Sequence, residues 1–143
     1  MERRDGCFDL VADVWERSSL LMQRLAQESR AHYLHVLQPN FHATEGKPLS
    51  PEERASTRKA TPEQMLVPRG YQELRRRGER LRASGVAFHD LTDVFQAERA
   101  TLYVDACCHF NLRGNRILAE RIADLAADLI AGSAEDGTQE DDP

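Results

Sequence analysis

An aspartate and a histidine lie close together in the last third of this 143-residue chain. Asp105 precedes His109 by four residues, in a stretch that leads into an apolar-rich segment. A carboxylate held against one imidazole nitrogen orients the ring and stabilises its charged form, while the other nitrogen can take a proton from a hydroxyl. The two residues therefore predict a general-base pair of the kind that activates a serine nucleophile.

The residues around this pair resemble a known family. The stretch LYVDACCHFNLRGNRILAERIA at 102–123 is similar to the C-terminal motif of the SGNH or GDSL hydrolases, in which an Asp and a His precede a Gly-Asn pair and a closing amphipathic helix. The likeness extends upstream to YLHVLQPN at 33–40 and to GKPLSPEE at 46–53. It covers most of residues 8 to 131.

The resemblance implies a three-layer flavodoxin-like α/β fold, hydrolysis of an ester or acyl substrate, and a Ser-His-Asp set without metal or organic cofactor. It assigns His109 as the base and Asp105 as the orienting acid. The sequence departs from the family in two respects. The acid usually precedes the histidine by three residues rather than four, and the Gly-Asp-Ser nucleophile and Gly-x-Asn-Asp segments are missing.

The seven serines do not replace this nucleophile. None lies in a Gly-x-Ser-x-Gly or Gly-Asp-Ser motif, so no strained turn is predicted to expose an activated hydroxyl. They are Ser18, Ser19, Ser29, Ser50, Ser56, Ser84 and Ser133. We therefore interpret the chain as the C-terminal half of an SGNH hydrolase-like domain, inactive alone. The alternative is a non-catalytic remnant that acts as an interaction or self-association module.

The three cysteines are Cys7, Cys107 and Cys108. The adjacent pair could bridge only through a strained eight-membered ring, so no disulfide framework is predicted. No Cys-x-x-Cys spacing is present, which disfavours a zinc site and favours a reducing compartment. Cys107 or Cys108 as a nucleophile beside His109 is disfavoured, because neighbouring side chains usually point apart.

Composition and charge predict one small soluble domain, since 41% of the residues are apolar and 30% are charged. The formal charge of −5 resides in residues 132–143, which hold five carboxylates and no basic residue and are expected to form a disordered acidic tail. The neutral remainder argues against nucleic acid or a membrane surface as a partner. No secretory signal follows Met1, so a cytoplasmic location is the default expectation.

Helical periodicity predicts helices over residues 8–29, 71–85 and 112–131, the last one capped by Asn111. In the first helix one face is apolar, and it is made of Val11, Val14, Trp15, Leu21, Met22 and Leu25. The second helix has a basic cluster interpreted as a solvated face, which is made of Arg75, Arg76, Arg77, Arg80 and Arg82. Pro68 and Gly70 are expected to interrupt the chain before this helix.

Shorter signals fill the gaps between these helices. SPEE at 50–53 and TPEQ at 61–64 predict capped helix starts, 92–100 one or two helical turns, and Gly114 with Asn115 a tight turn into the last helix. Strands are predicted over 33–37 and 86–91, with a short third extended piece over 102–105. His35 and His89 in these strands are expected to be packed or solvated, the alternative being a ligand site at the carboxyl edge of the sheet.

This order predicts an α/β fold with two or three short parallel strands joined by right-handed helical crossovers. Parallel strands are normally buried within larger sheets, so the predicted sheet is incomplete and one of its edges would be open. We expect a second copy of the chain, or a missing N-terminal half, to cover that edge.

Overall fold

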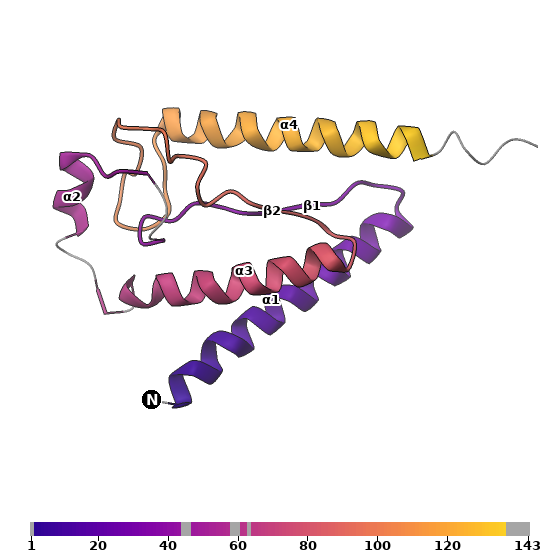
Figure 1. The fold of residues 1–143 in the computed structure, drawn as a ribbon, viewed down its shortest axis with the longest axis horizontal. Helices are drawn as coiled ribbons and strands as arrows, with labels where there is room; N and C mark the ends of the chain where they lie inside the picture. The colour runs from indigo at the N-terminus through magenta and orange to yellow at the C-terminus, as the bar shows by residue number, and fades with distance from the viewer. Residues whose placement is uncertain (1, 44–46, 58–60, 63, 137–143) are drawn as a thin grey trace, which may run out of the picture.

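The computed structural model describes residues 2–43, 47–57, 61, 62 and 64–136. Two short parallel strands lie between helices, with α4 along one face and α1 and α3 on the other (Figure 1). The elements are α1 Glu2–Glu28, β1 Leu34–Leu37, α2 Pro51–Thr57, η1 Gln64–Leu66, α3 Val67–Ala83, β2 Ala87–Asp90 and α4 Leu112–Asp136. No helix in this described part is long and apolar enough to cross a membrane.

The sheet confirms the two predicted parallel strands. β1 pairs with β2 from Leu34↔Ala87 to Leu37↔Asp90, and it is a two-stranded sheet within the described ranges. The expected third piece over 102–105 is not a strand, since it forms only an isolated antiparallel bridge between Tyr103 and Phe110. The chain therefore has a mixed α/β fold with an open two-stranded sheet.

Helix starts follow the predicted capping chemistry. Ser50 N–H donates to Glu53 Oε2 at 2.7 Å and Glu53 N–H donates to Ser50 Oγ at 3.2 Å, which caps α2 reciprocally. Thr61 and Gln64 repeat this exchange at 2.8 and 3.4 Å. The expected interruption at Pro68 is wrong, because a proline in the first turn of α3 lacks only a donor that has no helical partner there.

Two other local predictions are corrected. Residues 92–97 form turns rather than helix, and Asp90 Oδ1 accepts the N–H of Thr92 at 2.9 Å at their start. Gly114 and Asn115 lie inside α4 rather than in a turn before it, and Asn111 caps this helix by accepting the Gly114 N–H at 3.0 Å. The helix continues past the predicted end to Asp136, and residues 137–143 of the expected acidic tail lie outside the described residues.

The core consists of two apolar clusters. The first lies between the sheet and the helices α1 and α3, and it contains Leu37, Leu81, Val86 and Phe88 with Trp15 packed against them. A side chain at Gly78 of α3 would place Cβ 2.1 Å from the Phe88 ring, so this close approach requires glycine. The second cluster includes residues on both sides of the segment with Asp105 and His109. It contains Phe41, Phe95, Leu102 and Tyr103, with Phe110 and Ile117 packed against them.

The helix α1 turns a charged side, rather than its apolar stripe, toward α3. Arg77 of α3 is buried, with its side chain 7% exposed, and its guanidinium lies 2.5 Å from Asp9 Oδ1 and 2.6 Å from Glu16 Oε2. The interpretation of the basic cluster as a solvated face is therefore wrong for Arg77. Most of the stripe points outward, and the exposed members are Val11, Val14, Leu21, Met22 and Leu25.

Candidate functional site

The structure brings Asp105 and His109 together. Asp105 Oδ2 is hydrogen-bonded to His109 Nδ1, and Oδ1 accepts the backbone N–H of Cys107 at 2.9 Å and that of His109 at 3.5 Å. The His109 side chain is 73% exposed and that of Asp105 42% exposed. Within the described part of the chain, the hydrogen bonds leave His109 Nε2 without a partner and open to solvent.

This geometry sets the chemistry of the pair. A neutral imidazole that donates from Nδ1 to a carboxylate has its lone pair on Nε2, where it can accept a proton. The hydrogen bond from His109, helped by the backbone N–H groups, lowers the pKa of Asp105 below its ordinary value. Asp105 therefore stays ionised and is placed to accept a hydrogen bond from a proton-bearing Nδ1 of His109.

The four-residue spacing does not separate the two side chains. Residues 104–108 form bends, and Cys107 N–H folds back onto the Asp105 carboxylate. On either side, Val104 N–H donates to His109 O at 3.0 Å, and the bridge from Tyr103 to Phe110 closes the segment. This turn brings the acid and the imidazole together across a spacing of four residues. We call residues 104–109 the His-Asp loop.

A buried carboxylate fixes the start of the His-Asp loop. Glu53 Oε1 accepts the N–H groups of Leu102 and Tyr103 at 2.8 and 3.0 Å, and Oε2 is paired with Lys47 Nζ. Both charged side chains are fully buried. Burial alone would raise the pKa of Glu53, but the bonds from Lys47, Ser50, Leu102 and Tyr103 lower it below its ordinary value. A buried ion pair with this many donors holds two distant segments in one arrangement.

We call Glu53, with Lys47 and the backbone N–H groups that it binds, the Glu53 clamp. The sequence analysis missed this clamp, because it interpreted Glu53 only as the acid of a capping box. The available signal was Lys47 itself, a charged residue in an otherwise apolar Gly-Lys-Pro-Leu stretch ahead of the capped helix. The partner of Glu53 beyond that stretch, the backbone near Leu102, lies about fifty positions along the chain, so local spacing could not reveal it.

The other side of the His-Asp loop is tied to the segment that follows β1. Phe41 N–H donates to Cys107 O at 2.8 Å, and Ala106 O lies 2.8 Å from His42 Nε2 and 2.9 Å from Gln64 Nε2, which donates to it. The loop therefore lies at the carboxyl end of β1, where sites in parallel sheets commonly form.

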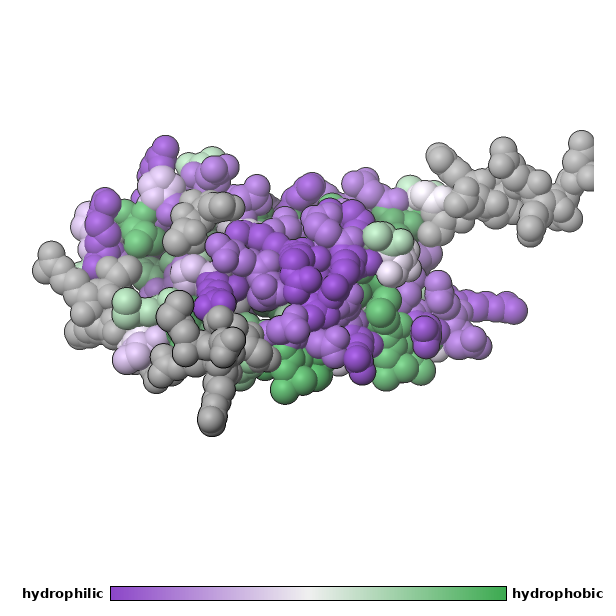
Figure 2. Space-filling model, turned by 60° about the horizontal axis from the view of Figure 1, so that its bottom comes forward, coloured by the Kyte–Doolittle hydropathy of each residue, from purple (hydrophilic) through white to green (hydrophobic). Residues whose placement is uncertain are grey.

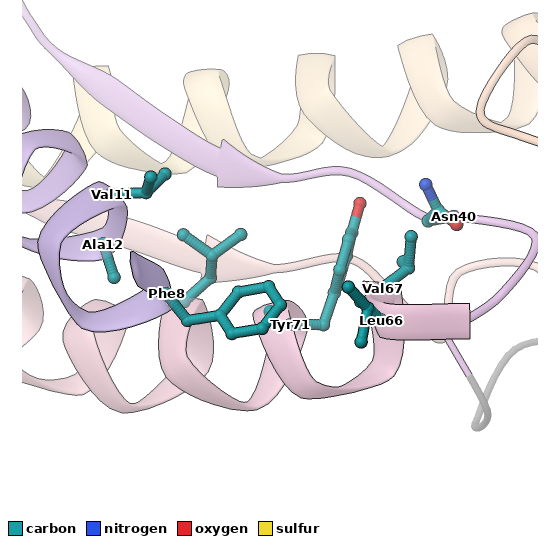
Figure 3. Close-up of a pocket in the computed structure, with 9 residues that line it drawn as sticks. Phe8, Val11, Ala12, Asn40, Leu66, Val67 and Tyr71 are labelled. Carbon is teal, nitrogen blue, oxygen red and sulfur yellow. The ribbon is translucent and has the colours of Figure 1, made fainter. Parts of the chain in front are cut away.

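An apolar pocket of about 330 Å³ adjoins this segment (Figure 3). Phe8 from α1 and Leu66, Val67 and Tyr71 from η1 and α3 converge on it, and Asn40, next to Phe41, supplies a polar edge. Burial raises the pKa of Tyr71 to about 12. The pocket is thus neutral and mostly apolar, and its edge at Asn40 directly precedes Phe41, which contacts the His-Asp loop.

The serine of α1 and the strand histidines singled out in the sequence are not hydrogen-bonded to the pair in the described part of the chain. Ser19 is buried, with its hydroxyl 2.7 Å from His35 Nδ1, and His35 packs against Trp15 at 4.5 Å, so this histidine is packed in the core as expected. Burial lowers the pKa of His35 and of His89. Among the described residues, no cluster of three or more His, Cys, Asp or Glu side chains is arranged to hold a metal ion.

Comparisons with known proteins add no family or relative to this geometry. A scan against models of protein families, a search of curated protein sequences and a search of solved structures each gave no match.

Proposed function

We propose that this chain provides the acid and base, Asp105 and His109, of an SGNH-type ester or acyl hydrolase. In this proposal the chain is the C-terminal half of a three-layer flavodoxin-like domain, and a second polypeptide segment adds the serine nucleophile and the oxyanion donors. The observation that carries the proposal is the state of His109: its Nδ1 is held by Asp105 while its Nε2 faces solvent. That is the state a general base requires before it meets a hydroxyl.

The position of the pair supports this function. The His-Asp loop lies at the carboxyl end of β1, helices cover both faces of the sheet, and an apolar pocket adjoins the segment that holds the loop. A substrate with an apolar acyl group would find both a base and a non-polar surface at this end of the sheet.

The nucleophile is assigned to another segment because the interior serines are already engaged. Ser19 contacts His35, and Ser50 is buried in the cap of α2. A hydroxyl becomes a nucleophile only when a base can reach it, and in the described part of the chain no serine is hydrogen-bonded to His109.

The direct test is the tautomer of His109. In ¹⁵N-labelled protein in alkaline buffer, the nitrogen shifts of His109 are expected to show a proton on Nδ1 and a lone pair on Nε2. Asp105→Asn should mix the two tautomers, whereas His32→Ala, at another exposed histidine, should leave the His109 signals unchanged. A proton found mainly on Nε2 would refute the assignment of His109 as the base.

Activity gives a second test. The isolated chain should hydrolyse p-nitrophenyl acetate no faster than an equal concentration of free imidazole. Mixing it with a polypeptide that carries the Gly-Asp-Ser and Gly-x-Asn-Asp segments of an SGNH hydrolase should give turnover that His109→Ala abolishes and His32→Ala preserves. Turnover indifferent to His109→Ala contradicts the proposal. Fast His109-dependent turnover by the chain alone contradicts the assignment of the nucleophile to another segment.

A second candidate function, self-association, is favoured by the outer face of α1. Six large apolar side chains of this 27-residue helix are 50–64% exposed. They are Leu10, Val11, Val14, Leu21, Met22 and Leu25. Figure 2 turns the side with α1 and α3 toward the viewer, and green side chains interrupt its largely purple surface along the lower edge. Together these side chains expose an apolar area on the order of 500 Å², a size at which surface patches often mark an interaction site.

The spacing on this face points to a second copy of the chain as its occupant. Steps of four and three alternate along the positions Cys7, Val11, Val14, Ser18, Leu21 and Leu25. That is the a/d pattern by which two identical helices pack knobs into holes. A stable dimer buries about 800 Å² per partner, and the outer face of α1 would supply a large part of that area.

Molecular mass in solution decides this second candidate. Light scattering after size exclusion at about 100 µM should give twice the monomer mass. Leu21→Glu should restore the monomer, and Gln27→Glu, on the opposite side of the same helix, should not. A wild-type monomer at that concentration rules the dimer out.

A further inference from the structure

The two adjacent cysteines lie in the His-Asp loop, between the acid and the imidazole. Their Sγ atoms are 2.8 Å apart, and both residues are half-buried, so small molecules can still reach them. A disulfide bond is about 2.05 Å long, so the sulfur atoms need to approach by under about 1 Å. The side chains have thus already turned toward each other, against the usual tendency of neighbouring residues.

We propose that Cys107 and Cys108 form a redox-modification site, which small disulfides of the glutathione class convert into a vicinal disulfide. Because the two cysteines are adjacent in the sequence, the ring that closes has eight members and is strained. Strain raises the reduction potential of a disulfide, and strained disulfides are the labile, regulatory ones. The pair is therefore suited to reversible oxidation rather than to permanent cross-linking.

The reaction balances with one small disulfide as the oxidant. The thiolate of one cysteine attacks a sulfur of that disulfide, forming a mixed disulfide and releasing one small thiolate. The second cysteine, as its thiolate, attacks the protein sulfur of the mixed disulfide and releases the other small thiolate. The two cysteine protons end on the released thiols, and two electrons pass from the cysteines to the small disulfide.

The electrostatics suggest which cysteine reacts first. The hydrogen bond with Cys107 and partial burial raise the pKa of Cys108 to about 11. Cys108 therefore keeps its proton at neutral pH and can donate it toward the sulfur of Cys107. This favours Cys108 as the resolving thiol, so that the first attack falls to its neighbour.

Ring closure would act on the bonds that hold the His-Asp loop. The peptide group between Cys107 and Cys108 becomes part of the ring and must reorient, and its carbonyl oxygen is the acceptor for Phe41 N–H at 2.8 Å. On its other side, Cys107 N–H is a donor to Asp105 Oδ1. Oxidation would therefore weaken the hold on Asp105, and reduction would restore it. If the proposed function holds, the thiols regulate the same acid-base pair.

The test uses the variant Cys7→Ser, which removes the exposed thiol of α1 and leaves the pair. Incubation with glutathione mixtures from reduced to oxidised, acid quenching and mass analysis of the peptide around residues 105–111 should give a species lighter by two hydrogen atoms, reversed by dithiothreitol. The ¹⁵N signals of the His109 ring should shift in step with its formation. Cys107→Ser and Cys108→Ser should each form only a mixed disulfide and leave those signals in place.

Two results would overturn the inference. One is the addition of glutathione to both cysteines, or dimerisation through them, without the intramolecular bond. The other is a vicinal disulfide that leaves the His109 signals unchanged. Neither result depends on ester turnover, so this proposal and the hydrolase proposal can fail separately.

Discussion

Two carboxylates near residues 101–104, Glu53 and Asp105, differ in what surrounds them. Glu53 is fully buried and its oxygens accept from Lys47 and from three backbone N–H groups. Asp105 is 42% exposed, and its main partner is a histidine that can gain and lose a proton. Hydrogen bonds lower both pKa values. Glu53 thus has fixed donors and holds the fold together. Asp105 instead binds a side chain that can exchange a proton with a substrate group, so it can take part in a reaction.

Removing the buried carboxylate should have the largest effect. Glu53→Ala leaves Lys47 buried without its partner and frees the N–H groups of Leu102 and Tyr103. Loss of one member of a buried pair costs about 3–5 kcal/mol, so urea denaturation should show a drop of that size or no folded state. The exposed neighbour is the control, because Glu52→Ala should change the free energy of unfolding far less than Glu53→Ala does. Equal effects of the two variants would contradict the structural role of Glu53.

Removing the buried cation should cost less. Lys47→Met keeps an unbranched apolar side chain in place, and Glu53 retains its three backbone donors. We expect a loss of about 2 kcal/mol in the free energy of unfolding, since the remaining hydrogen bonds offset part of the charge burial. A loss larger than that of Glu53→Ala would show that the carboxylate depends on the lysine more than on the backbone.

The stability of the wild type should fall more steeply in acid than that of Glu53→Gln, whose side chain is neutral. The folded pKa of Glu53 is below the ordinary value of 4.5, so its contribution to stability is present above about pH 4.5 and is lost as pH falls through the folded pKa. One such group changes stability by at most about 1.4 kcal/mol per pH unit. In urea titrations between pH 3 and 7, Glu53→Gln should flatten this acid limb by up to that slope. An unchanged limb would assign it to other carboxylates.

The exposed pair should matter least to stability. Asp105→Asn and His109→Ala each remove one exposed ion pair, and such pairs contribute about 1 kcal/mol or less. Thermal and urea midpoints should therefore stay close to those of the wild type. His109→Ala should also let the pKa of Asp105 rise toward 3.8, which carboxyl ¹³C titration measures. Unfolding of either variant would mean that the pair is a structural element and would remove the contrast with Glu53.

The sequence predicts the elements well where local chemistry decides them. Periodicity and capping residues locate α1, α3 and α4, and Ser50 and Glu53 cap α2. Short apolar runs with bordering loop residues locate β1 and β2. Their neighbours in space are harder to predict. The interruption expected at Pro68 and the strand expected at 102–105 failed because the first depends on its place in the helix turn and the second on having a partner strand.

For the site, sequence reasoning paired Asp105 with His109, and the structure places them in contact. The Glu53 clamp, the contact between Cys107 and Cys108 and the burial of Arg77 escaped it. Each of these depends on a conformation or on a distant segment. The three carboxylates that surround Arg77, for example, come from α1, more than sixty positions earlier in the chain.

The helix α1 packs on α3 through charged side chains and exposes its apolar stripe, which affects how the protein responds to salt. Dissolved ions shorten the Debye length from about 8 Å at physiological strength to about 3 Å at 1 M, which weakens the outer pairs formed by Arg76 and Arg80 with α1. Sulfate and similar salts at the same time strengthen association of apolar surfaces. High salt should therefore weaken only these outer contacts of α1, since the pairs of the buried Arg77 are screened less, while its exposed apolar side chains associate more readily.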